Sequence, residues 1–117
     1  MSDLLQRLTV RHLQEAYYSI LESIKSNLEA VKRLDRAFNI VSKDSAYHIT
    51  YISGNPVTFH VQGPNDMYTV INSQRLCTCP DNQVLCKHRL AISLILNAIN
   101  LQKRDGISIN VKGEQDE

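Results

Sequence analysis

The sequence predicts an α+β fold in one small domain, with a long N-terminal helix, an antiparallel three- to four-stranded meander and a C-terminal helix. Apolar residues recur every three or four positions over residues 10–38 and again over residues 85–104, which is the period of a helix. Between these segments, over residues 46–77, the period shifts towards two, and turn residues separate short apolar runs. That pattern is typical of strands joined by hairpins.

Composition limits the class of protein. A chain of 117 residues with 43% hydrophobic residues, two Phe and no Trp can form one modest, largely aliphatic core. The net charge of +1 gives no indication of a nucleic-acid or membrane partner. No apolar run is long enough to span a membrane, and the N-terminus lacks the pattern of a secretion signal. We therefore expect an intracellular protein, cytoplasmic or, in a eukaryote, nuclear, that does not bind membranes.

Residues 1–42 form the predicted helical segment, in which neither Pro nor Gly interrupts residues 10–38. A heptad step through this helix meets apolar side chains everywhere except at Asn27: Val10, Leu13, Tyr17, Ile20, Ile24, Val31, Leu34 and Phe38. Small Ala residues border this seam, which favours packing against the protein's own sheet or helix. A helix-mediated homodimer is the alternative, although few of the charges that set coiled-coil pairing flank the seam.

Residues 43–104 contain the predicted sheet, a metal-binding unit and the last helix. Strand-like runs at 47–52, 57–61 and 67–71 alternate with turn residues, and a short fourth strand leads to Leu76 and Cys77. Short connections between consecutive strands imply an antiparallel meander. The helix over residues 85–104 has Gly106 placed to stop it. The acidic tail, residues 105–117, is predicted to be disordered.

The C-terminal helix is apolar on most of its sides. We assign one face to the interior of the protein: Leu90, Ala91, Leu94, Ile95, Ala98 and Leu101. Ile92, Leu96 and Ile99 then lie largely on the other side. They are either covered by the N-terminal helix or exposed as a partner-binding patch, because exposed apolar surface usually marks an interface. This second helix is also a candidate surface for a homodimer.

The chemistry-bearing residues gather in one short segment. Cys77 and Cys79, two apart on a strand, point to the same side, and Cys86 and His88 follow after a six-residue loop at the start of the last helix. Three cysteines clustered in a chain without a secretion signal favour metal binding over disulfides. Three Cys and one His form a closed tetrahedral donor set for one structural Zn²⁺, with no open position for a catalytic water.

Other interpretations of these residues are weaker. The cysteines could be unmetallated core thiols, with His88 a solvated residue beside them. They could also form a Cys77–Cys79 redox pair or hold an iron–sulfur cluster. The redox pair lacks the usual Cys-x-x-Cys spacing, and a single His with tight spacing disfavours the cluster. His12, His48 and His60 have no ligand-like neighbours in the sequence and are left out of the site.

The Cys77-x-Cys79 and Cys86-x-His88 pairs, followed by Ala91, resemble the SWIM zinc finger. The resemblance extends from about residue 68 to residue 98. It implies a ββα zinc unit that binds DNA or proteins. Because the motif follows a helical extension and no attached enzyme is visible, the chain is similar to the free-standing SWIM proteins of the Shu-complex type. Those proteins partner RecA-like recombinase paralogues in homologous recombination, which is the function that the resemblance implies here.

Two functions follow, and both are non-enzymatic because neither a Gly-rich phosphate loop nor a nucleophile–base pair is visible. The first is a zinc-stabilised protein-interaction adaptor in recombination or DNA repair, with Ile92, Leu96 and Ile99 as the partner-binding residues. The alternative is a DNA-binding zinc finger, either a regulator or a mobile-element or viral accessory protein. It would contact phosphates through Arg75, Lys87 and Arg89, with binding that weakens as salt rises.

Overall fold

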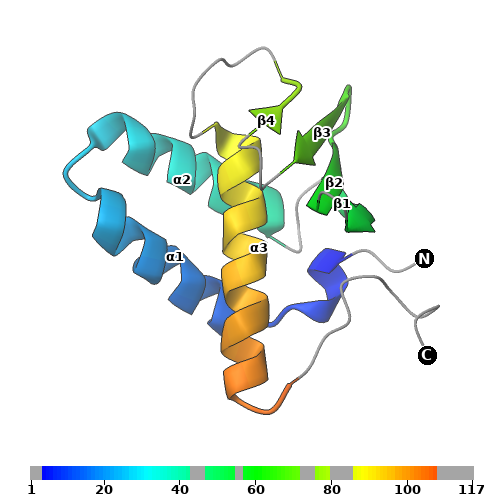
Figure 1. Cartoon of the computed structure of the whole chain (residues 1–117). Helices are drawn as coiled ribbons and strands as arrows, with labels where there is room; N and C mark the ends of the chain where they lie inside the picture. Colours follow the sequence, from blue (N-terminus) through cyan, green and yellow to red (C-terminus); the bar gives the residue numbers. More distant parts are fainter. Residues whose placement is uncertain (1–3, 43–46, 55–56, 72–75, 80–85, 108–117) are drawn as a thin grey trace.

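The computed structural model describes residues 4–42, 47–54, 57–71, 76–79 and 86–107, and it has the predicted α+β fold (Figure 1). The elements are, in chain order, η1 (Leu4–Arg7), α1 (Val10–Ile24), α2 (Leu28–Val41), β1 (His48–Gly54), β2 (Val57–Gln62), β3 (Met67–Ile71), β4 (Leu76–Cys77) and α3 (Lys87–Arg104). Among the described residues, no helix is both long and apolar enough to cross a membrane.

The N-terminal segment is a hairpin of two helices, which corrects the prediction of one long helix. Helix α1 ends at Ile24, and α2 starts at Leu28 after the N-cap residue Asn27. The Asn27 side chain accepts a hydrogen bond from the backbone N–H of Ala30 at 3.2 Å. Asn27 is also the one polar position of the heptad seam, and Asn is among the residues that best cap a new helix. The apolar period continues across the turn, so periodicity alone does not reveal the break.

The four strands form the predicted antiparallel meander in the order β1-β2-β3-β4. Ile49 lies opposite Val61, and Phe59 lies opposite Val70, so one face of the sheet presents a row of fully buried side chains. The register between β1 and β2 shifts between Tyr51 and Ser53. Because side chains alternate along a strand, every second residue of β3 and β4 faces the same buried layer.

Helix α3 runs through the middle of the molecule, between the α1–α2 hairpin and the sheet (Figure 1). This position explains why the helix is apolar on most sides. The residues assigned to the interior are buried except Leu101, which is partly buried. Ile92 is fully buried as well, and Leu96 and Ile99 are partly buried against the core. Of the two outcomes that the sequence left open for these positions, the structure has the covered one at Ile92, while Leu96 and Ile99 keep part of their surface exposed.

The end of α3 is fixed by a C-terminal cap, as Gly106 predicted. Gly106 has φ +87°, its N–H donates to the Lys103 carbonyl at 3.1 Å, and the Ile107 N–H donates to the Gln102 carbonyl at 2.7 Å. These two bonds form a Schellman motif. The described part thus includes residues 105–107 of the segment predicted as a tail, and residues 108–117 lie outside it.

Asp105 joins this cap to the start of α1. Its carboxylate accepts hydrogen bonds from Arg104 and from Arg11, and it lies 2.8 Å from Nε2 of the buried His12. The Arg104 guanidinium, followed by His12, holds the pKa of Asp105 well below its usual range. His12 also contacts the hydroxyl of Thr9, the N-cap of α1. Residues more than ninety positions apart in the sequence are thereby connected at one corner of the fold.

Truncation of Ile92 tests its burial. Ile92→Ala should lower the free energy of unfolding by about 2–5 kcal/mol, because it removes a fully buried aliphatic side chain and leaves a cavity. Leu28→Ala is the matched control, since Leu28 is 67% exposed and its truncation should change stability by no more than about 0.5 kcal/mol. Urea denaturation of both zinc-loaded variants measures the difference, and equal midpoints would contradict the burial of Ile92.

Candidate metal centre

The sheet register places Cys77 and Cys79 on the side that faces α3. Cys77 lies opposite Val70 in the register, so the side chains of Cys77 and Val70 are on the same face of the sheet. Val70 is fully buried, which makes this the buried face. The ladder continues one residue beyond β4, because the Thr78 N–H donates to the Thr69 carbonyl at 3.1 Å and the Thr78 hydroxyl accepts from the Thr69 N–H at 2.9 Å. Two residues after Cys77 the alternation returns to that face, and Cys79 is buried there.

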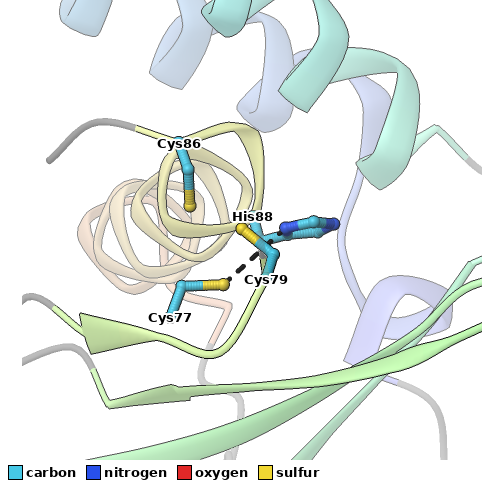
Figure 2. Close-up of side chains that lie close together, drawn as sticks. All are labelled: Cys77, Cys79, Cys86 and His88. Atoms are coloured by element: carbon cyan, nitrogen blue, oxygen red, sulfur yellow. Dashed lines mark hydrogen bonds between the residues drawn. The ribbon is translucent and has the colours of Figure 1, made fainter. Parts of the chain in front are cut away.

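The other two candidate ligands come from the start of α3. Cys86 is the N-cap, with φ −69° and ψ 161°, and His88 belongs to the first helical turn. Both side chains are buried. The free N–H groups and the dipole of a helix N-terminus favour a thiolate at this position. Figure 2 shows the three sulfur atoms and the imidazole of His88 converging between the end of β4 and the first turn of α3.

The geometry of the four side chains fits a tetrahedral zinc ion. One ligand atom from each of the four residues lies within 4.8 Å of all the others, and Cys77 Sγ is 3.7 Å from His88 Nδ1. Ligands about 2.3 Å (sulfur) and about 2.1 Å (nitrogen) from a tetrahedral zinc ion are about 3.6 Å apart. All three cysteines are free thiols, so none is held in a disulfide. Cys77, Cys79, Cys86 and His88 are therefore positioned to hold one structural Zn²⁺.

The thiols of Cys77 and Cys86 have pKa values that are shifted in opposite directions. The pKa of Cys86 is lowered to about 4, chiefly because its thiolate accepts a hydrogen bond from Cys77 and further bonds from His88 and the Arg89 N–H, while burial opposes the shift. The pKa of Cys77 is raised, because its thiol keeps the proton of that shared bond and because it is partly buried. Cys86 is thus the first thiolate of the group, and zinc binding displaces the remaining thiol protons.

Cys77 and Cys79 at the end of β4, with Cys86 and His88 at the start of α3, form a candidate zinc-finger metal site. Residues 59–97, a third of the chain, match the family model of the SWIM zinc finger, and the four candidate ligands lie within the matched segment. The match covers β3, β4 and most of β2 and α3, and it leaves the α1–α2 hairpin outside. Neither the curated proteins nor the solved structures contain a match to the chain.

The remaining predicted site residues are dispersed. Arg89, predicted to contact phosphates, is only 8% exposed and lies beneath the surface, so its assignment is corrected. Lys87 is half-buried at the start of α3, and Arg75 lies outside the described residues. Of the predicted partner-binding residues on α3, Ile92 belongs to the core, and Leu96 and Ile99 are partly buried against it. The sequence count of basic residues near the motif does not distinguish these environments.

A second group, His12, Glu15 and Asp105, also has ligand-type atoms close together. Here each carboxylate has a cation beside it, because Arg104 pairs with Glu15 and with Asp105, and Arg11 pairs with Asp105. His12 is engaged by Thr9 and Asp105. We assign this group a structural role, in which its side chains connect the start of α1 to the end of α3 without a metal ion.

Sequence reasoning missed the role of Tyr68. Its ring lies against the imidazole of His88, with the ring centroids 4.6 Å apart and the planes at 38°. The alternation along β3 places Tyr68 on the same face as Val70, and hence beneath the metal ligands. The period of two was visible in the sequence, but the pairing of β3 with β4 was needed to connect it to the Cys77 strand.

Replacement of His88 tests the ligand set. His88→Asn and Cys86→Ser should both abolish stoichiometric zinc and destabilise the fold, because apparent zinc-binding energies of about 10–16 kcal/mol are coupled to folding in zinc-finger peptides. Metal analysis and thermal melting of purified protein provide the two measurements. The matched control is His48→Asn, an exposed position on β1 away from the centre, which should retain one zinc. Full zinc content in His88→Asn would remove His88 from the ligand set.

Proposed function

We propose that the chain is a non-enzymatic adaptor, in which a structural zinc supports the fold and the α1–α2 hairpin binds a protein partner. The closed Cys₃His donor set supports a structural role for the metal, because four protein ligands leave no position for a catalytic water. The docking surface differs from the one predicted from the sequence, since Ile92 is part of the core. The observation that supports the adaptor function is an apolar groove on the outside of the hairpin.

This hairpin groove is made by two adjoining hollows of about 250 and 90 Å³ that share Gln14 and Phe38. Its apolar lining comes from both helices: Val10, Leu13, Tyr17, Tyr18, Phe38 and Val41. Tyr18, in the larger hollow, is 65% exposed, and Val10, in the smaller one, is 54% exposed, so each hollow has one exposed large apolar side chain. Tyrosines are enriched in the centres of protein interfaces, where one face of the ring is buried and the hydroxyl keeps a polar contact.

The aromatic floor of the groove is held in place before any partner binds. The Tyr17 hydroxyl donates to the Asp35 carboxylate at 2.6 Å, which connects α1 to α2 and raises the pKa of Tyr17 to about 12. The Tyr17 ring contacts Tyr18 and Phe38 edge to face, with centroids 5.2 Å away in both cases. A preorganised surface loses less entropy on association than a mobile one. This favours a protein partner with its own apolar anchor.

The partner that we propose is a RecA-like recombinase paralogue, in homologous recombination or DNA repair. Support comes from the match to the SWIM zinc finger together with the helical hairpin outside it, an arrangement that resembles the SWIM proteins of the Shu-complex type. Direct DNA binding by one basic surface of Arg75, Lys87 and Arg89 is the weaker candidate, because Arg89 is buried. A homodimer through the same groove would compete with the partner for Tyr18.

Replacement of the exposed groove residues tests the adaptor function. The double variant Val10→Ser, Tyr18→Ser should keep its zinc and its fold but weaken partner binding by about 30-fold, the effect of losing one interface hot spot. Quantitative co-purification from the source cells identifies the partner, and titration of the purified pair gives the affinity.

Ile52→Ser is the matched control, because Ile52 is an exposed apolar residue on β1, away from the groove, with 45% exposure. It should bind the partner as the wild type does. If the partner is not a RecA-like ATPase, the recombination role is wrong. If groove and control variants bind the partner equally well, the hairpin groove is not the docking surface.

A further inference from the structure

A cleft of about 360 Å³ lies beside the metal centre, between α2, the β2–β3 loop and the start of α3. Cys79 and His88, two of the zinc ligands, form part of its wall. The other side chains that matter here are Arg36 from α2, Tyr47, Asp66, Tyr68 and Lys87. This volume is within the range of pockets that hold small ligands.

His88, a residue of the cleft wall, has an unpaired donor on the ring edge that points away from the sulfurs. Its Nδ1 faces the sulfurs, 3.7 Å from Cys77 Sγ, and the opposite side of the ring points away from them (Figure 2). The side chain is 3% exposed, and its Nε2 is buried with no hydrogen-bond partner among the described residues. When Nδ1 binds zinc, the proton of the neutral ring must be on Nε2, so this atom is a donor.

A donor in this position ordinarily has an acceptor. Metal-ligating histidines almost always donate their second N–H to a carboxylate, a backbone carbonyl or water, and a buried donor without an acceptor is costly. Since His88 lines the cleft and its Nε2 has no acceptor from the described chain, a molecule in the cleft can supply the acceptor oxygen.

The cleft contains two cations that can pair with an anionic acceptor. Lys87, the first residue of α3, and Arg36 contribute two cations, and the free N–H groups of the helix start add to the positive field. Asp66 is the acidic residue of the lining, and its carboxylate accepts a hydrogen bond from the Tyr68 hydroxyl at 3.3 Å. The zinc–thiolate group carries about −1. Its ligand Cys79 is part of the cleft wall, whereas the Cys77 sulfur lies on the Nδ1 side of the His88 ring.

The aromatic lining narrows the class of anion. The Tyr68 ring packs on His88, and the Tyr47 ring closely approaches Gly63, where any Cβ would lie 3.0 Å from it. Both tyrosines are half-buried and line the same cleft as the two cations. Aromatic faces beside cations are the combination by which proteins hold single-stranded nucleotides, with the base stacked and the phosphate paired. An acidic peptide would use the cations but would not need the rings.

We propose that this cleft binds one nucleotide unit, whose phosphate accepts a hydrogen bond from His88 Nε2 and pairs with Lys87 and Arg36, while its base stacks on the tyrosines. The unit is either a free mononucleotide or one residue of a single strand, since both present the same phosphate and ring. The site goes beyond the proposed adaptor function and does not use the hairpin groove, so each can fail without the other.

The test follows the ¹⁵N signal of His88 Nε2 by NMR in the zinc-loaded full chain. The probes are thymidine 5′-monophosphate, a short oligodeoxythymidine, thymidine, inorganic phosphate and a polyglutamate peptide. We expect the monophosphate and the oligonucleotide to shift this signal saturably, and thymidine and phosphate to bind at least about tenfold more weakly, because each lacks half of the contacts. Tighter binding of the oligonucleotide than of the monophosphate identifies a strand as the ligand, and the reverse identifies a free nucleotide.

Variants separate the cleft from general charge. Lys87→Gln and Arg36→Gln should each weaken nucleotide binding by about tenfold with zinc content unchanged, because each removes one charged hydrogen bond. Lys103→Gln, at the far end of α3, is the matched control and should bind as the wild type does. Lys87 lies between the ligands Cys86 and His88 in the sequence. If Lys87→Gln loses zinc for that reason, the nucleotide affinity of Arg36→Gln alone tests the proposal. The proposal is overturned if the Nε2 signal responds to none of the probes, if polyglutamate binds as tightly as the nucleotides, or if Arg36→Gln and Lys103→Gln bind nucleotide equally well.

Discussion

The zinc ligands connect the last strand of the sheet to the first turn of α3, and the arrangement of the layers depends on that connection. Strand β4 consists of two residues, Leu76 and Cys77, so its ladder alone fixes the sheet edge weakly. Ligation adds a free energy that is large compared with the stability of a small domain. With the start of α3 held against β4, the helix lies along the buried face of the sheet, and the α1–α2 hairpin then covers its other side.

The sequence predicted the features that depend on local chemistry. The strands, the zinc ligands and the stop at Gly106 each follow from residues that are close together in the chain. It failed where the outcome depends on what covers a surface. The apolar period runs on through Asn27, so the helix break was missed, and an all-round apolar helix does not reveal that both its sides are covered, as at Ile92. Similarly, counting charges near the motif could not show that Arg89 is buried.

The cleft beside the metal centre was not predictable for the same reason, because its walls come from α2, the residue before β1, the β2–β3 loop and α3. Only the structure shows that the ring of His88 separates two environments. On one side are the sulfurs that zinc binds, and on the other is a buried donor with no partner among the described residues. A metal on Nδ1 fixes the tautomer and the orientation of the ring. The structural zinc would therefore also prepare one hydrogen-bond donor of the cleft.

Helix α2 takes part in both proposed binding surfaces. Its buried face, which includes Leu34 and Ala37, packs on α3. Asp35 and Phe38 lie along the hairpin groove, while Arg36 reaches the cleft. Successive residues of a helix are about 100° apart around its axis, so neighbouring positions can serve different surfaces. Zinc acts on the cleft directly, through His88, but on the groove only through the packing of α3 against α2. Loss of the metal is thus more damaging to the cleft than to the groove as long as the hairpin and α3 stay packed.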